Sequence, residues 1–176
     1  MQIRNIKRYL LKLMRKDIVD FDIREYRKTG MKIGGGCRIF SKLNTSEPYL
    51  IQIGNKVTIS TNVSLITHDN SAIKVYSQGT DFVGEIQIGD NCFIGANTTI
   101  LPGVTLADNV IVGAGSVVTK SFLMAGVVIA GNPAKVVGNI NSIRERYEEK
   151  VFDFSGEKRR NKKSIILEHP EKYIKK

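Results

Sequence analysis

A six-residue period runs from Ile88 to Lys120 and constrains the fold more than any other feature of the sequence. The aliphatic residues that begin successive units are Ile88, Ile94, Ile100, Leu106, Val112 and Val118. Small or β-branched residues follow four positions later, at Cys92, Thr98, Val104, Val110 and Ser116. Gly often comes directly after the first residue of a unit, and Asn, Asp, Gly or Pro fills many of the remaining positions.

This period fits neither an α-helix, which repeats every 3.6 residues, nor a simple strand, which alternates every two. A hexapeptide repeat is typical of a parallel β-helix, in which each unit is one short strand and a corner. The aliphatic residue and the residue four positions later point into a narrow core, while Gly and Asn suit the corners because they tolerate positive φ. Three units close one coil, and coils stack about 4.8 Å apart. Ordinary sandwich strands would share this phase only by coincidence.

The composition agrees with a narrow aliphatic core, because 41% of the 176 residues are hydrophobic and Trp is absent. The formal net charge of +10 favours anionic partners such as phosphorylated cofactors, nucleic acid or anionic lipid; of these, nucleic acid is not expected. The sequence shows no signal peptide and no apolar run that would span a bilayer. We therefore expect a cytoplasmic protein.

The two cysteines, Cys37 and Cys92, fall in the same inward phase but two coils apart. Coils that stack about 4.8 Å apart separate them by about 10 Å. A disulfide needs Cα atoms within about 7 Å. Both cysteines are therefore expected to be unpaired core residues.

Residues 1–28 are expected to be helical, because apolar residues recur at helical spacing between basic residues. One interpretation is a basic amphipathic helix that contacts the inner face of a membrane. The other, which we favour, is a cap that covers the open first coil of the solenoid.

Two coils precede the regular run. The first begins near Ile33 and ends in an irregular third side over residues 44–52. The second is regular and is anchored by Ile53, Ile59 and Leu65.

The next anchor would fall at residue 71, but the pattern resumes at Ile88, so residues 71–87 are expected to leave the solenoid as a loop. A long loop in a compact repeat is usually functional. Tyr76 and Phe82 are its candidate contacts with a ligand or a neighbouring subunit.

After a partial coil, the sequence predicts a helix over residues 139–154 and a charged tail with a short helix. The fold class is therefore an all-β solenoid with three parts. They are an N-terminal helical cap (residues 1–30), a β-helix domain of about five coils (31–138) and a C-terminal helix with a basic tail (139–176).

His68 is the main candidate for chemistry. It is one of two histidines, and the other, His169, lies in the charged tail. His68 lies at the corner of the last unit before the loop, on the outside of the predicted solenoid. A neutral imidazole there can accept a proton from a hydroxyl or an amine near neutral pH. A structural histidine is the alternative, but the position at the loop boundary favours catalysis.

The region from His68 to Pro133 resembles the hexapeptide-repeat acyltransferases, in particular the sugar, polysaccharide and xenobiotic acetyltransferases. The resemblance rests on ITHDN, IGDNCFIGANTTILPGVTLADNVIVGAGSVVTK and AGNPAKVV, and extends over residues 31–138. It implies a left-handed β-helix and a homotrimer with active sites between subunits. It also implies that His68 is the general base for direct attack of an acceptor hydroxyl on acetyl-CoA, without a metal ion.

The resemblance assigns a set of positions to acetyl-CoA. They are Phe93, Ala96, Ala114, Thr119, Lys120, Gly131, Pro133 and Lys135. The alanines match main-chain contacts to the pantetheine arm, and the lysines match basic positions near the phosphates, where Lys acts as a point charge. The alternatives are corner geometry for the alanines, a trimer contact for Phe93 and ordinary surface lysines.

The acceptor contacts are predicted from the resemblance and from the loop. They are Ser41, Asn44, Asp69, Tyr76 and Phe82. The expected function is acetyl-CoA-dependent O-acetylation of a sugar hydroxyl in surface polysaccharide biosynthesis. Xenobiotic acetylation and N-acetylation of an amino sugar are the alternatives within the enzyme class.

Two other classes of protein share this fold. A zinc carbonic anhydrase needs three histidine ligands, whereas the repeats carry only His68. A non-catalytic trimeric scaffold is the alternative of a different class. The combination of His68, the loop and GNPAK argues against a scaffold, which has no chemical need for the histidine.

Overall fold

The structure, a computed structural model, describes residues 6, 18–156 and 161–175. It divides the chain into two compact units, Met1–Asn139 and Ile140–Lys176. The predicted helix over residues 1–28 therefore lies largely outside the described residues, and its described part begins, apart from residue 6, at Ile18.

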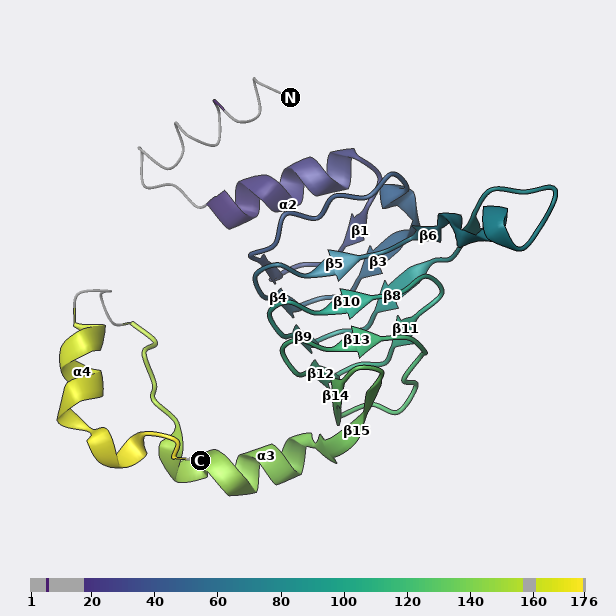
Figure 1. The fold of residues 1–176 in the computed structure, drawn as a ribbon. Coiled ribbons are helices and arrows are strands. Elements are labelled where there is room, and N and C mark those ends of the chain that lie inside the picture. Colours follow the sequence, from purple (N-terminus) through teal and green to yellow (C-terminus); the bar gives the residue numbers. More distant parts are fainter. Residues whose placement is uncertain (1–5, 7–17, 157–160, 176) are drawn as a thin grey trace. The chain divides into compact units, whose positions relative to one another are not determined.

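Short strands stack into a three-sided β-helix in the first unit (Figure 1). The first side contains β1 (Lys32–Ile33), β3 (Ile51–Ile53), β8 (Ile86–Ile88) and β11 (Thr105–Leu106). The second contains β2 (Arg38–Ile39), β4 (Thr58–Ile59), β9 (Phe93–Ile94), β12 (Ile111–Val112), β14 (Val127–Gly131) and β15 (Ala134–Asn139). The third contains β5 (Ser64–Leu65), β10 (Thr99–Ile100) and β13 (Val117–Val118). The pairs are parallel except for β14 with β15, which confirms the predicted parallel β-helix.

Equivalent residues of successive coils lie over one another. On the first side the register joins Ile33 to Ile53, Ile53 to Ile88 and Ile88 to Leu106. All four side chains belong to one buried core. Because alternate side chains of a strand point to opposite faces, the neighbours of these residues point outward. The cysteines are buried and unpaired, as predicted.

Asparagines shape several corners of the coils. Asn62, Asn91, Asn97 and Asn109 all have φ between 55° and 60°, a left-handed conformation that Asn adopts more readily than most residues. Their side chains stack in pairs: Asn62 Nδ2 donates to Asn97 Oδ1 over 3.2 Å, and Asn91 Nδ2 donates to Asn109 Oδ1 over 2.8 Å. The corners thus add side-chain bonds to the main-chain ladder.

Helix α2 (Ile18–Lys28) covers the open end of the first coil (Figure 1). It packs against β1 and β2 and buries Ile23 and Tyr26 in the core. The Tyr26 hydroxyl accepts a hydrogen bond from the N–H of Leu43 over 3.1 Å. This is the arrangement of a solenoid cap. The basic residues that suggested membrane contact precede α2 and lie outside the described residues.

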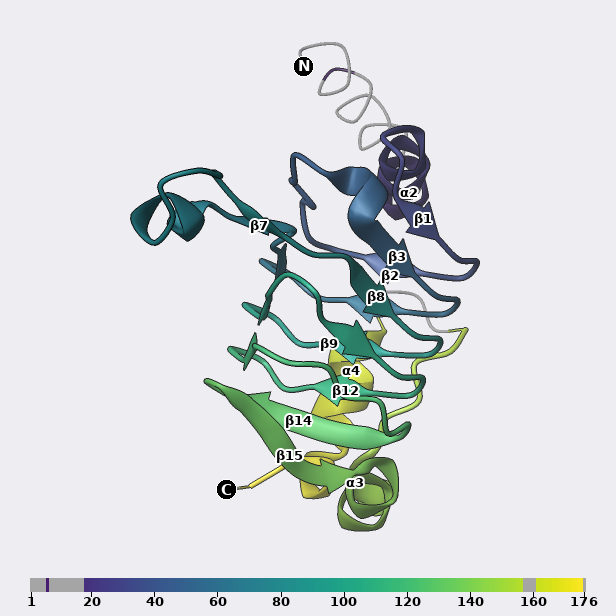
Figure 2. The same ribbon diagram turned by 90° about the vertical axis from the view of Figure 1, so that its right-hand side faces the viewer.

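An arm leaves the solenoid after β5 and returns at β8 (Figure 2). It contains the antiparallel strands β6 (His68–Asp69) and β7 (Phe82–Val83), with the 3₁₀ turn η2 (Asn70–Lys74) between them. The predicted loop, residues 71–87, ends two residues too late. Ile86 is already buried in β8 and pairs with Ile51, so the solenoid resumes before the first regular six-residue unit.

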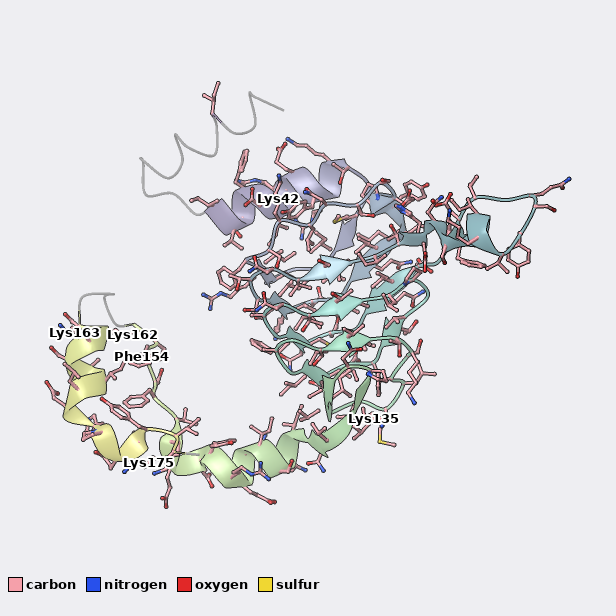
Figure 3. The ribbon with its side chains drawn as sticks, in the orientation of Figure 1. Lys42, Lys135, Phe154, Lys162, Lys163 and Lys175 are labelled. Carbon is pink, nitrogen blue, oxygen red and sulfur yellow. The ribbon has the colours of Figure 1, made fainter. Side chains whose placement is uncertain are left out.

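The second unit contains α3 (Ile140–Tyr147), α4 (Lys162–Glu168) and the 3₁₀ turns η3 (Glu148–Lys150) and η4 (Pro170–Lys172). The predicted helix over residues 139–154 is thus shorter than expected. Phe152 and Phe154 stack with ring centroids 5.6 Å apart, and Lys162 Nζ lies 4.4 Å from the Phe154 ring centroid (Figure 3). Within the described part of the chain, every helix is too short or too polar to cross a bilayer.

Candidate active site

His68 forms a hydrogen bond with Glu47 at the base of the arm. The distance from His68 Nδ1 to Glu47 Oε2 is 2.8 Å. His68 follows β5 by three residues, and Glu47 lies in the irregular third side of the first coil, just before the 3₁₀ turn η1 (Pro48–Leu50). The side chains are 40% and 21% exposed, respectively, so the imidazole is accessible while its partner is more enclosed.

The Thr67 hydroxyl holds the Glu47 carboxylate, and the Thr45 hydroxyl bonds to Thr67 and to the Glu47 main chain. Thr67 Oγ1 donates to Glu47 Oε2 over 2.7 Å. Thr45 Oγ1 lies 2.5 Å from Thr67 Oγ1 and 3.3 Å from the N–H of Glu47, which donates to it. Thr67 is only 1% exposed. The carboxylate that orients His68 is therefore itself held by a buried hydroxyl.

The electrostatics of the pair follow from this geometry. Glu47 raises the pKa of His68, first through the hydrogen bond and then through its charge, and Asp81 and Asp69 add to the effect. The hydrogen bonds from Thr67 and then from His68 lower the pKa of Glu47. Glu47 is therefore ionised at neutral pH and accepts the proton of Nδ1–H, which leaves Nε2 of a neutral imidazole as a proton acceptor.

A pocket of about 600 Å³, called the His68 pocket below, opens beside this pair. Its walls come from α2, from the irregular third side of the first coil and from the segment that leads from β5 to the arm. Representative lining residues are Thr29, Leu43, Asn44, Ser46, Leu65 and His68. The volume lies within the range of small-molecule sites.

The predicted acceptor contacts lie in two places, near His68 and on the arm. Asn44 lines the His68 pocket, and Asp69 directly follows His68 on β6. Tyr76 and Phe82 pack edge to face on the arm, with ring centroids 6.1 Å apart, and both are exposed.

Ser41 requires a correction. Its side chain is 5% exposed, donates to Ser60 O and accepts from the N–H of Val63 over 2.7 Å. The hydroxyl is thus occupied by internal hydrogen bonds, and Ser41 is a structural residue of the first coil rather than an acceptor contact.

One edge of the solenoid carries most of the predicted cofactor positions. The register joins Ile94 to Val112 and Val112 to Ile129. Ala96, Ala114 and Gly131 each follow one of these residues by two positions, so they form a column along the corner after the second side. Ala114 and Gly131 are exposed and Ala96 is half-buried. Small side chains in a column let an extended ligand approach the main chain closely.

The neighbouring predicted contacts lie around this column. Phe93 is 44% exposed on β9. Pro133 and Lys135 are exposed in and after the β14–β15 turn, and Lys135 extends from β15 (Figure 3). An ammonium group there suits a phosphate.

Thr119 and Lys120 lie at a different corner. The register joins Leu65 to Ile100 and Ile100 to Val118. Lys120 follows Val118 by two positions, and Thr67 follows Leu65 by two positions, so these two residues occupy equivalent corners. Lys120 therefore lies at the same corner of the solenoid as the segment that leads to His68, but two coils further along. In a single chain, His68 and the column of small residues therefore lie at the two ends of the third side.

Sequence reasoning missed Glu47, Thr45 and Thr67. Glu47 lies in the only irregular side of the first two coils, where the six-residue period gives no register. No sequence motif marks a single glutamate that precedes a short 3₁₀ turn. Only the fold shows that it faces His68. Within the described residues, no group of three or more His, Cys, Asp or Glu gathers where a metal ion could bind.

Comparisons with known proteins identify the family. Residues 85–120, which include β8 to β13, match the family model described as the hexapeptide repeat of succinyl-transferase. Protein CapG of Staphylococcus aureus is 44% identical over 171 residues, which covers 92% of this chain and 94% of that protein. The chain belongs to the hexapeptide-repeat acyltransferases.

Two solved structures of acetyltransferases share the fold of this acyltransferase. The maltose O-acetyltransferase from Clostridium difficile 630 has a TM-score of 0.51 and 27% identity, covering 65% of this chain and 72% of that chain. A hexapeptide-repeat acetyltransferase from Vibrio cholerae, solved with acetyl coenzyme A, has a TM-score of 0.56 and 26% identity, covering 63% and 61%. The β-helix of this family is left-handed, as predicted.

Proposed function

We propose that this acyltransferase transfers an acetyl group from acetyl-CoA to a hydroxyl of a sugar, with His68 as general base. The observation that carries the proposal is the 2.8 Å contact between His68 Nδ1 and Glu47 Oε2, beside a pocket of about 600 Å³. A carboxylate that accepts from Nδ1–H fixes the tautomer and leaves Nε2 to accept a proton, which is the state a general base requires.

The chemistry follows from that state. His68 Nε2 accepts the proton of the acceptor hydroxyl as the oxygen attacks the thioester carbonyl. Glu47 stabilises the imidazolium that forms, because its negative charge lies within hydrogen-bond distance. His68 then returns the proton to the sulfur as the carbon–sulfur bond breaks. No covalent enzyme intermediate is needed, and both cysteines are buried away from solvent.

The residues fit acetyl-CoA along two edges of the solenoid. The column of Ala96, Ala114 and Gly131 allows close approach of the pantetheine arm to the main chain, and Lys120 and Lys135 suit its phosphates. Because the column and His68 lie at opposite ends of one side, a site between two copies of the chain would bring them together. This supports a homotrimer with three equivalent sites.

A sugar acceptor is supported by the Clostridium structure, which is a maltose O-acetyltransferase with 27% identity to this chain. Assembly of a surface polysaccharide is the process we propose for that acceptor. The reaction is proposed to occur in the cytoplasm, where acetyl-CoA is available. Contact of the basic N-terminal residues with the inner face of a membrane stays a prediction from the sequence.

Release of coenzyme A thiol from acetyl-CoA tests the proposal. The acceptor panel contains maltose, methyl pyranosides, amino sugars, nucleotide sugars, and streptogramin and chloramphenicol drugs, with a control that lacks acceptor. The expected result is thiol release with a sugar hydroxyl and a product heavier by one acetyl group. Turnover only with a drug would assign a xenobiotic acceptor instead of a sugar hydroxyl, and turnover only with an amine would assign N-acetylation. Absence both of turnover and of acetyl-CoA binding would favour a scaffold.

A further inference from the structure

The first coil has no strand on its third side, so within the described residues one edge of β5 is unpaired. On the other two sides the first coil contributes β1 and β2, which pair with β3 and β4. On the third side the chain instead runs irregularly from Asn44 into η1, and β5 pairs with β10 alone. The irregular segment that supplies Glu47 thus also leaves a gap above β5.

The main chain of Leu65 faces this gap. In a parallel ladder, the N–H and C=O groups of alternate residues point to opposite sides. The N–H groups of Ser64 and Ile66 donate to the next coil, over 2.9 Å in both cases. The N–H of Val63 points the other way and donates to Ser41 Oγ in the first coil. Leu65 shares that direction, so its N–H and C=O point into the gap.

The His68 pocket lies along this edge. Four consecutive residues, from Leu65 to His68, line it. A second pocket of about 210 Å³ shares Leu43, Asn44 and Leu65 with it. The walls combine hydroxyl and amide side chains with apolar ones. This mixture suits a sugar ring, which has hydroxyls at its edge and carbon–hydrogen bonds on its faces.

The charge around the His68 pocket is negative, although the chain carries a net charge of +10. Glu47 contacts His68 directly, and the charges of Asp69 and Asp81 also act on the imidazole. Among the described residues that line the pocket there is neither Lys nor Arg. Lys42 lines the second pocket instead (Figure 3). An anionic group beside His68 would meet like charges, and none of the described residues that line the His68 pocket is a Lys or Arg that could balance it.

We infer that the sugar unit that receives the acetyl group binds in the His68 pocket, hydrogen-bonds to the main chain of Leu65 and bears no anionic group. The inference rests on the proposed function and adds the class of acceptor to it. The unpaired edge of β5 recognises the sugar ring by hydrogen bonds with its main-chain N–H and C=O groups. No side-chain substitution removes these groups. The negative surroundings of His68 exclude uronic acids and sugar phosphates from this position.

Selective ¹⁵N-leucine labelling tests the inference by NMR. The full chain is titrated with methyl glucopyranoside, methyl galactopyranoside and the matching uronides. The expected result is a shift of the Leu65 amide signal with a neutral pyranoside, and at least tenfold weaker binding of its uronide. Asn44→Trp, which fills the pocket, should abolish the shift. Arg24→Trp, on the exposed surface of α2 and outside this pocket, should leave it unchanged, and thermal unfolding of both variants confirms their fold.

The outcomes separate this inference from the proposed function. Equal or tighter binding of a uronide, or a Leu65 signal that no pyranoside moves, would overturn the inference. Thiol release with a sugar in either case would leave the O-acetyltransferase proposal intact. Conversely, a neutral pyranoside that moves Leu65 without any thiol release would support the pocket and contradict the proposed reaction.

Discussion

At the scale of single residues, the chemistry depends on how Glu47 holds His68. The carboxylate accepts from His68 Nδ1 and from Thr67 Oγ1, over 2.8 and 2.7 Å. Two donors keep it ionised, and its charge in turn favours the protonated imidazole. The same contact that orients the base also makes it stronger, so its removal should change both the rate and the pH dependence.

Glu47→Gln should lower kcat by roughly 10–100-fold, the cost seen when a metal-bound histidine loses the group that orients it. Activity needs the neutral imidazole, so it rises as the pH rises through the pKa of His68. Because Glu47 raises that pKa, the midpoint of the pH–rate profile should move to lower pH in the variant. The measurement is kcat against pH for wild type and variant.

Glu85→Gln is the matched control, since Glu85 is also a carboxylate bonded by two side chains, those of Gln52 and Gln87. It should leave the profile unchanged. An unshifted profile in Glu47→Gln would show that Glu47 does not set the pKa of His68.

Lys135→Ala tests the phosphate end of the proposed cofactor groove. Loss of an exposed charge contact costs about 0.2–1 kcal/mol, so the KM for acetyl-CoA should rise by a factor of about 1.4 to 5, and kcat should change little. The KM should also rise with salt, because screening weakens exposed charge pairs. Lys163→Ala, an exposed lysine of the second unit, is the control. Equal KM values in both variants would show that Lys135 does not contribute to acetyl-CoA binding.

At the scale of elements, the six-residue period predicts the regular coils because core packing imposes it. Each unit must return an aliphatic side chain to the same column, as Ile94 does between Ile59 and Val112. The segment from Asn44 to η1 escapes this constraint because it packs no strand onto β5. The sequence of this segment therefore has no repeat from which the positions of Glu47 and of the pocket could be predicted. The sequence identified His68 because it lies at the corner of a regular unit, next to the loop.

Ile94→Ala should cost about 2–5 kcal/mol in the free energy of unfolding, the usual cost of truncating a buried isoleucine. Ile94 has no exposed surface and lies between two coils. Phe93→Ala, the adjacent residue with its ring on the outer face and 44% exposed, should cost about 1 kcal/mol or less. Denaturant unfolding measures both, and similar costs would contradict the assignment of inner and outer faces.

At the scale of the whole molecule, the buried core belongs to the first unit. The core cluster extends from Ile23 to Ala134, and the second unit forms its own contacts, such as the hydrogen bond from Tyr173 to Ile166 O over 2.8 Å. Lys162 and Phe154 add a cation–π contact there. The stability of the β-helix should therefore depend little on the second unit.

A chain that ends at Asn139 should unfold cooperatively, with a midpoint within about 4 °C of the full chain, which corresponds to about 1 kcal/mol for a protein of this size. Calorimetry of both chains measures this. A much larger loss, or an insoluble product, would show that the second unit stabilises the β-helix.

Thiol release from acetyl-CoA by wild type and by His68→Ala, at saturating acceptor, shows whether His68 is the general base of an acetyl transfer. We expect a loss of roughly 10²–10⁴-fold in kcat, with unchanged thermal unfolding, because His68 is half exposed and outside the core. Turnover that is undiminished in a folded variant would contradict the claim.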